Sequence, residues 1–155
     1  MDNYFLLKML HILSATVLTG TGAGIAFFMF MAWRSGSTEA VRVTTRHVVL
    51  ADWIFTAPAV VIQLVTGLLL ANRLGISMLS PWMLAVTGLF IFIGCCWLPV
   101  VWIQYRLRAL AGAEQLEREK FDRCMRLWTA LGIPAFTALL VVYWLMVFKP
   151  LALTQ

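Results

Sequence analysis

The feature that most constrains this chain is a series of four apolar runs, each long enough to cross a lipid bilayer as a helix. The hydrocarbon core of a bilayer is about 30 Å thick, which requires roughly 20 apolar residues in a helix. The runs occupy residues 4–33, 48–72, 82–105 and 127–148. We therefore expect four transmembrane spans within one domain of residues 1–155, with the lipid bilayer as its solvent.

Composition and connection length set the fold class. Of the 155 residues 62% are hydrophobic and 12% are charged, whereas soluble chains are near a quarter charged. This excludes a soluble enzyme, a disulfide-stapled secreted domain and a nucleic-acid-binding protein as default interpretations. The first run is too long for a cleaved signal peptide, so we keep it as a helix. Four helices with short connections predict an all-α, integral membrane, antiparallel four-helix bundle.

The basic residues gather in two of the three connections, and this predicts the orientation. Cytoplasmic connections of membrane proteins carry an excess of lysine and arginine. We therefore expect connections 34–47 and 106–126 to be cytoplasmic and both termini to lie on the outer, periplasmic side of a bacterial inner (plasma) membrane. These connections are expected to meet anionic lipid headgroups and not nucleic acid. Their basic residues are Arg34, Arg42, Arg46, Arg106, Arg108, Arg118, Lys120, Arg123 and Arg126, against Lys8, Arg73 and Lys149 elsewhere.

His11 is an ionisable residue inside the first run, about 10 Å below Tyr4 along the helix. Ionisable groups at membrane depth usually face the interior of the bundle and mark functional sites. Small residues such as Ser14 and Ala15 continue its helix face, so His11 is expected to point inward. A neutral imidazole there can ligate heme iron or another metal. The alternative is a histidine that is hydrogen-bonded across helices and holds them together.

The second run carries a polar stripe at the spacing of one helix face. Gln63 lies at nearly the depth of His11, so we expect the two side chains to touch. Asp52 lies about one turn in from the cytoplasmic end, where an unpaired carboxyl favours its protonated form. We interpret Asp52 either as half of an interfacial ion pair with a nearby arginine, which we favour, or as part of a proton or cation relay. The stripe consists of Asp52, Thr56, Ala59, Gln63 and Thr66.

His47 is the second histidine and belongs to the opposite end of the bundle. It is 36 positions from His11, at the inner surface, where it can join Asp52 and Thr56 in the relay or ion pair. His11 and His47 therefore cannot be the two axial ligands of one heme. A bis-histidine cytochrome built from this chain needs two sites or a dimer.

Several segments resemble a bacterial family of predicted integral membrane proteins that is catalogued as a domain of unknown function. They are 4–13, 49–58, 97–102 and 144–150, so the resemblance covers essentially the whole chain and implies four spans. More distantly, the Leu-His of the first run and the terminal Val-Phe-Lys-Pro resemble HemJ-type protoporphyrinogen oxidases, and CopD-type membrane proteins share the opening. That resemblance implies a heme or porphyrin pocket at His11. Two basic positions of the HemJ type are apolar here, near Phe27 and Leu84, so the oxidase reaction is not carried over.

Two functional hypotheses follow. In the first, the protein holds heme b or a related porphyrin for redox or tetrapyrrole handling, with His11 as axial ligand and Gln63 beside it. In the second, it is a non-enzymatic carrier of a small solute or ion, or an assembly partner. The polar stripe then lines a path or a helix interface, with a homodimer or a membrane partner protein as the assembly.

Overall fold

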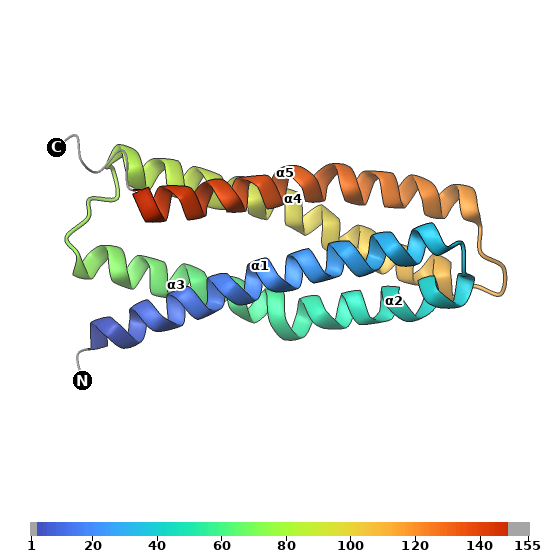
Figure 1. The fold of residues 1–155 in the computed structure, drawn as a ribbon. Helices are drawn as coiled ribbons and strands as arrows, with labels where there is room; N and C mark the ends of the chain where they lie inside the picture. The colour runs from blue at the N-terminus through green and yellow to red at the C-terminus, as the bar shows by residue number, and fades with distance from the viewer. Residues whose placement is uncertain (1–2, 149–155) are drawn as a thin grey trace.

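In a computed structural model that describes residues 3–148, the chain forms a bundle of four long antiparallel helices (Figure 1). Each of the four is long and apolar enough to cross a membrane. The expected all-α four-helix bundle is therefore confirmed, while Lys149 and Pro150 lie outside the described residues. The elements are α1 (Asn3–Ser35), α2 (Thr38–Ala51), η1 (Asp52–Thr56), α3 (Ala57–Arg73), α4 (Pro81–Gly112) and α5 (Arg118–Phe148).

The second rod of the bundle consists of α2, η1 and α3, which follow one another without a break. Its helix begins at Thr38, whereas we expected residues 34–47 to be a connection and the span to begin at 48. The Ser37 side chain accepts a hydrogen bond from the backbone N–H of Ala40, which is the usual cap of a helix start. Gly36 precedes it with φ of 70°, a conformation that glycine adopts without strain. The turn between α1 and α2 is therefore very short.

A single wide turn, η1, interrupts the hydrogen bonding of this rod. The N–H of Ala57 bonds to the carbonyl of Asp52, five residues back instead of four. Pro58 explains the change, because its ring has no N–H and would clash with the carbonyl four residues earlier in a regular helix. Single π turns of this kind are frequent at functional sites.

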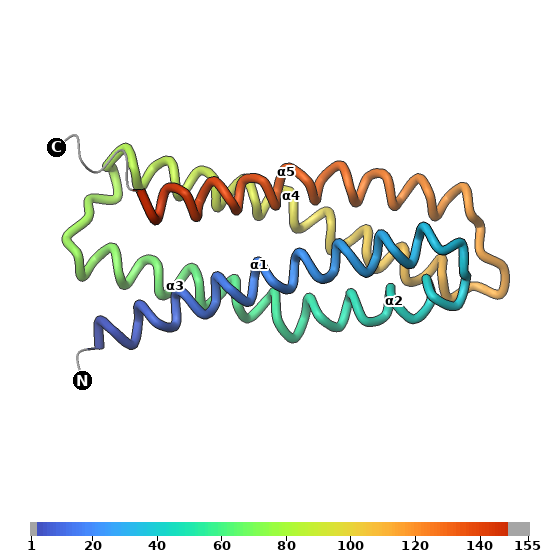
Figure 2. The backbone as a smooth tube through the Cα atoms, viewed as in Figure 1, coloured from blue at the N-terminus to red at the C-terminus, as the bar shows by residue number. Residues whose placement is uncertain are grey.

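The two ends of the bundle pack differently. We call the end with the α1–α2 and α4–α5 connections the basic end, and the opposite end the terminal end. A large apolar core fills the half near the basic end, where α2 packs between α1 and α4. At the terminal end the pairs α1–α3 and α4–α5 diverge (Figure 2). That end has a small core of Ala71, Trp82 and Met83.

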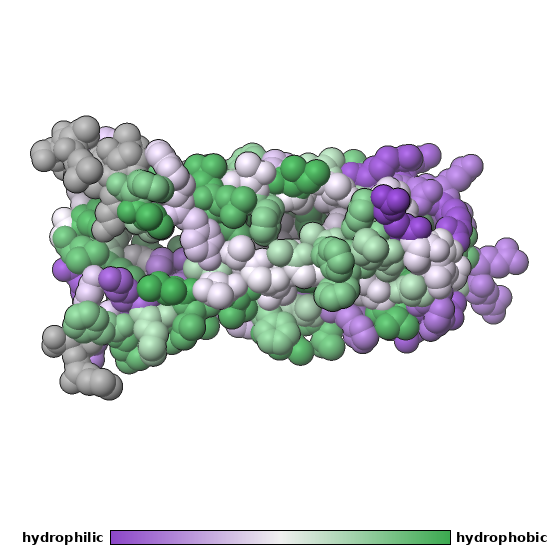
Figure 3. All heavy atoms as spheres, in the orientation of Figure 1, coloured by the Kyte–Doolittle hydropathy of each residue, from purple (hydrophilic) through white to green (hydrophobic). Residues whose placement is uncertain are grey.

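The outer surface of the rods is apolar between the two ends. Large side chains such as Phe5, Phe28 and Leu98 are more than half exposed, and a lipid environment removes this cost because acyl chains cover them. Figure 3 shows hydrophobic residues along the rods and hydrophilic residues gathered at the basic end. The chain is therefore a multi-pass integral membrane protein.

Candidate functional site

The first polar cluster lies between α1 and α3, and we call it the His11 cluster: His11, Ser14, Gln63 and Thr66. His11 Nδ1 lies 2.9 Å from Thr66 Oγ1, and His11 Nε2 lies 3.0 Å from Gln63 Nε2. The expected contact between His11 and Gln63 is therefore present. Ser14 Oγ donates to Gln63 Oε1 over 2.5 Å. These bonds join the two helices in the half of the bundle toward the terminal end.

The hydrogen-bond partners settle which ring nitrogen of His11 carries the proton. Thr66 Oγ1 lies 2.6 Å from the carbonyl oxygen of Ile62 and donates its hydrogen there, so it can only accept from the histidine. His11 Nδ1 therefore donates to Thr66. Gln63 uses its amide oxygen as acceptor for Ser14, so its NH₂ group donates to the lone pair on His11 Nε2. Each polar group in the cluster has a partner.

Close approach of the helices depends on Gly67. A Cβ built at this position would lie 3.2 Å from His11 Cε1, which is tighter than most side-chain contacts. The absence of a side chain lets the imidazole lie against the backbone of α3. The sequence around Gly67 therefore accommodates the ring.

The fit of heme to this site is decided by the lone pair on His11 Nε2. A neutral imidazole ligates iron through such a lone pair, and here it accepts from Gln63 at 3.0 Å. Iron at this position would require the Gln63 amide to leave and would separate Gln63 from Ser14. Residues 3–148 contain no group of three potential metal ligands. As arranged, the site does not fit an iron ligand; it fits an interhelical contact.

The second polar group lies in the half toward the basic end, and we call it the Asp52 cluster: Asp52, Thr56 and Gln104. All three are less than 9% exposed, and Thr56 and Gln104 are polar neighbours of the Asp52 carboxyl. Asp52 Oδ2 and Thr56 Oγ1 are nevertheless buried without a hydrogen-bond partner. Buried polar atoms are nearly always satisfied, so two adjacent orphans indicate a place where a proton, a water or a small ion can bind.

The ion pair that we favoured for Asp52 is not formed among residues 3–148. The ion pairs of these residues join Arg42 to Glu39 and Lys120 to Glu117, both on the surface. Arg42 instead donates to the carbonyl oxygens of Ala111, in the last turn of α4, and of Ala113, the residue that follows α4. The cations near the basic end serve other contacts or face solvent, because their long side chains reach the aqueous layer more cheaply than the bundle interior.

His47 lies apart from both clusters. It is 19 residues from Thr66 along the continuous second rod, which places it roughly 28 Å from the His11 cluster. Its side chain is exposed and lines a groove between α1 and α2 together with Thr21 and Thr44. The structure thus brings Asp52 and Thr56 together but leaves His47 outside their cluster.

Two polar contributors were missed by the sequence reasoning. Gln104 is a lone amide between Ile103 and Tyr105, and its polarity within an apolar run is a signal that could have found it. Tyr143 of α5 reaches the α1 hydroxyl of Thr19 at 3.0 Å.

The fold and these buried polar groups define an integral membrane protein with four transmembrane helices and polar side chains in its interior. A family model described as predicted integral membrane protein, DUF2269, matches residues 5–150. The chain belongs to this family. Comparisons with curated proteins and with solved structures find no match. The resemblance to HemJ-type and CopD-type proteins is not among these findings and stays a prediction.

Proposed function

We propose that this protein is a membrane carrier coupled to proton movement, with Asp52 as the proton-binding group. The observation that carries the proposal is the burial of the Asp52 carboxyl, 5% exposed, with Oδ2 unpartnered inside an apolar span. Asp52 has no salt-bridge partner among residues 3–148, and an ionisable side chain at membrane depth is a functional-site candidate, with proton relays among the roles of such carboxyls.

Polar side chains continue from Asp52 toward the terminal end. α1 and α3 run antiparallel, because His11 pairs with Thr66 while Ser14, further along α1, pairs with Gln63, earlier in α3. Continuing this pairing along both helices brings Thr21 level with Thr56. Thr56 and Gln63 are seven residues apart, or about 10 Å along the axis, a gap that water molecules would bridge. The second rod therefore carries polar side chains in both halves of the bundle, with the titratable Asp52 in one half and His11 facing the other half.

The His11 cluster can accept a proton without leaving a polar group unsatisfied. When His11 Nε2 is protonated, the Gln63 amide turns over and its oxygen accepts from the imidazole. Its NH₂ group then donates to Ser14, whose hydroxyl donates to the His11 carbonyl oxygen at 3.0 Å. The neutral and protonated forms thus each have a complete set of hydrogen bonds. This property supports a relay role for His11.

Proton flux into liposomes tests the proposal. The purified chain is reconstituted with a pH-sensitive dye inside, and a potassium gradient with valinomycin imposes a membrane potential. We expect the wild type to acidify the interior, and Asp52→Asn to reduce the rate to that of protein-free liposomes. Glu114→Gln is the matched control, because it makes the same chemical change on an exposed connection.

Two results would contradict the proposal. The first is a wild type that conducts no faster than protein-free liposomes under either sign of potential. The second is an Asp52→Asn variant that conducts at the wild-type rate. A change in thermal stability of Asp52→Asn without any wild-type flux would assign Asp52 a purely structural role.

Heme b at His11 is the competing function, and it makes a different prediction for the same purified protein. Expression with full heme supply would give a Soret band that His11→Ala removes. Colourless wild-type protein under these conditions rejects heme binding. The hydrogen bonds to both ring nitrogens lead us to expect colourless protein.

We also propose that the basic end faces the cytoplasm of a bacterial inner membrane. The support is the concentration of lysine and arginine at that end, which the positive-inside rule associates with the cytoplasmic side. Alkaline phosphatase, which is active in the periplasm, can be fused after residue 76 or after residue 115. We expect activity for the first fusion alone, and the reverse pattern would invert the orientation.

A further inference from the structure

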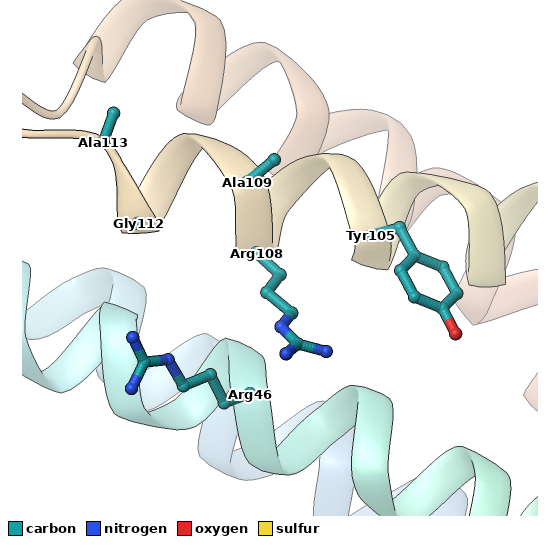
Figure 4. Close-up of a pocket in the computed structure, with 6 residues that line it drawn as sticks. All are labelled: Arg46, Tyr105, Arg108, Ala109, Gly112 and Ala113. Carbon is teal, nitrogen blue, oxygen red and sulfur yellow. The ribbon is translucent and has the colours of Figure 1, made fainter.

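The groove between α2 and α4 at the basic end carries two arginines on facing helices. Both line the groove: Arg108 extends from α4 toward α2, and the Arg46 side chain lies along α2 (Figure 4). The groove has a volume of about 660 Å³, and its wall beyond them is formed by Tyr105 and the small residues Ala109, Gly112 and Ala113. These small residues leave the wall of the groove open beside the two arginines.

These two charges have no acidic partner among residues 3–148. The ion pairs of this part of the chain involve Arg42 and Lys120, and neither Arg46 nor Arg108 donates a hydrogen bond to another described residue. Two like charges in one groove repel each other, and an anion between them converts this repulsion into two attractive contacts. Arginine is suited to the task because its planar group donates two parallel hydrogen bonds to phosphate oxygens.

Neighbouring hydrogen bonds fix the shape of the groove and neutralise the partial negative charge at the end of α4. Arg42 donates to the carbonyl oxygens of Ala111 and Ala113, which lie at the C-terminal end of α4. These contacts fasten α2 to α4 and neutralise the negative end of the helix dipole, which would otherwise repel an anion. Trp53 donates to the Tyr105 hydroxyl over 2.5 Å, so the hydroxyl hydrogen of Tyr105 remains free to donate into the groove.

The groove adjoins the apolar part of the rods at the basic end. Arg46 is two residues before the apolar run that begins at Val48, and the exposed aromatic residues Trp53, Trp102 and Tyr105 surround this level. Such aromatic belts lie at the boundary between acyl chains and headgroups. We propose that Arg46 and Arg108 form a binding site for a phosphate group that carries net negative charge. This chemistry is shared by an anionic phospholipid headgroup and by free phosphate.

Thermal unfolding of the full chain in detergent tests the site and distinguishes the two sources. Dioleoylphosphatidylglycerol is compared with dioleoylphosphatidylcholine, which has the same acyl chains but a zwitterionic headgroup, and inorganic phosphate is titrated separately. We expect phosphatidylglycerol to raise the midpoint of unfolding at lower concentration than phosphatidylcholine. If inorganic phosphate gives the same stabilisation and abolishes the effect of the lipid, free phosphate is the ligand. If only the lipid stabilises the protein, the ligand is the lipid headgroup.

Variants assign the effect to the two arginines. Arg46→Gln and Arg108→Gln should each weaken apparent binding by about tenfold, because each removes a charge-assisted contact. Arg108→Lys keeps the charge and the long stem but loses the planar group, so intermediate binding is expected. Arg126→Gln, an exposed arginine outside the groove, should bind as the wild type does. The proposal is overturned if Arg126→Gln loses as much as the groove variants, or if the double variant Arg46→Gln/Arg108→Gln still distinguishes the two lipids as the wild type does.

Discussion

Replacing Thr66 by valine tests whether the His11 cluster holds α1 against α3. The hydroxyl of Thr66 accepts from His11 Nδ1 at 2.9 Å, and valine keeps nearly the same shape without it. Interhelical hydrogen bonds in membranes contribute about 0.6 kcal/mol on average, with a maximum near 1.7. A buried donor left unsatisfied costs about 1–3 kcal/mol. Since His11 is half-buried, we expect a loss of about 1–2 kcal/mol in the free energy of unfolding.

Thr16→Val is the matched control on the facing helix. Its hydroxyl is exposed and donates to the carbonyl oxygen of Ile12 in its own helix, so no interhelical contact is lost. We expect a change below about 0.5 kcal/mol for this variant. The assay is unfolding by sodium dodecyl sulfate in mixed micelles, followed by tryptophan fluorescence and far-ultraviolet circular dichroism.

A double-mutant cycle extends the test to the other side of the imidazole. Ser14→Ala and Gln63→Leu remove the two partners of one hydrogen bond, and their coupling energy should be about 0.6 kcal/mol or more. Equal losses for Thr66→Val and Thr16→Val, together with a coupling energy of zero, would refute the idea that this cluster joins the helices.

Three further changes probe packing and surface charge. Gly67→Ala places a methyl group 3.2 Å from His11 Cε1, and we expect a lower midpoint of thermal unfolding in detergent because the ring must move. Trp82→Phe removes the 2.9 Å hydrogen bond to the Leu145 carbonyl oxygen, and faster hydrogen exchange at the terminal end should follow, without change at the basic end. Glu39→Gln should change the free energy of unfolding by less than about 0.5 kcal/mol, because its 3.7 Å ion pair with Arg42 is exposed. A larger loss of unfolding free energy, measured across a salt titration, would contradict this.

The fold was predictable because lipid simplifies the relation between sequence and structure. An apolar run of sufficient length must be a helix, since every backbone polar group needs an internal partner in the bilayer. The start of α2 at Thr38 was missed because residues 38–47 are too polar for a hydropathy argument. The cap at Ser37 and the acid Glu39 in the first turn were signals of a helix start that length reasoning ignored.

The candidate sites were predictable in part. Helix periodicity placed Gln63 and Thr66 on one face, and depth arithmetic brought Gln63 to His11. The predicted face does not continue unchanged to Asp52, because the π turn of η1 adds one residue between Asp52 and α3. The partner of Asp52 could not be obtained in this way, because which residue of α4 faces it depends on the rotation of that helix. Any of several arginines could reach the carboxyl by depth alone, whereas packing places the amide of Gln104 beside it.

The wide turn at η1 also determines which way α3 faces. Each residue of a helix advances the chain by about 100° around the axis, so the one extra residue of a π turn rotates everything beyond it by that amount. Deleting Ile54 would allow regular helical bonding and would swing Gln63 and Thr66 away from α1. The rotation of α3 relative to α2 about the axis of this rod is therefore set by one extra residue. This rotation turns Gln63 and Thr66 toward His11.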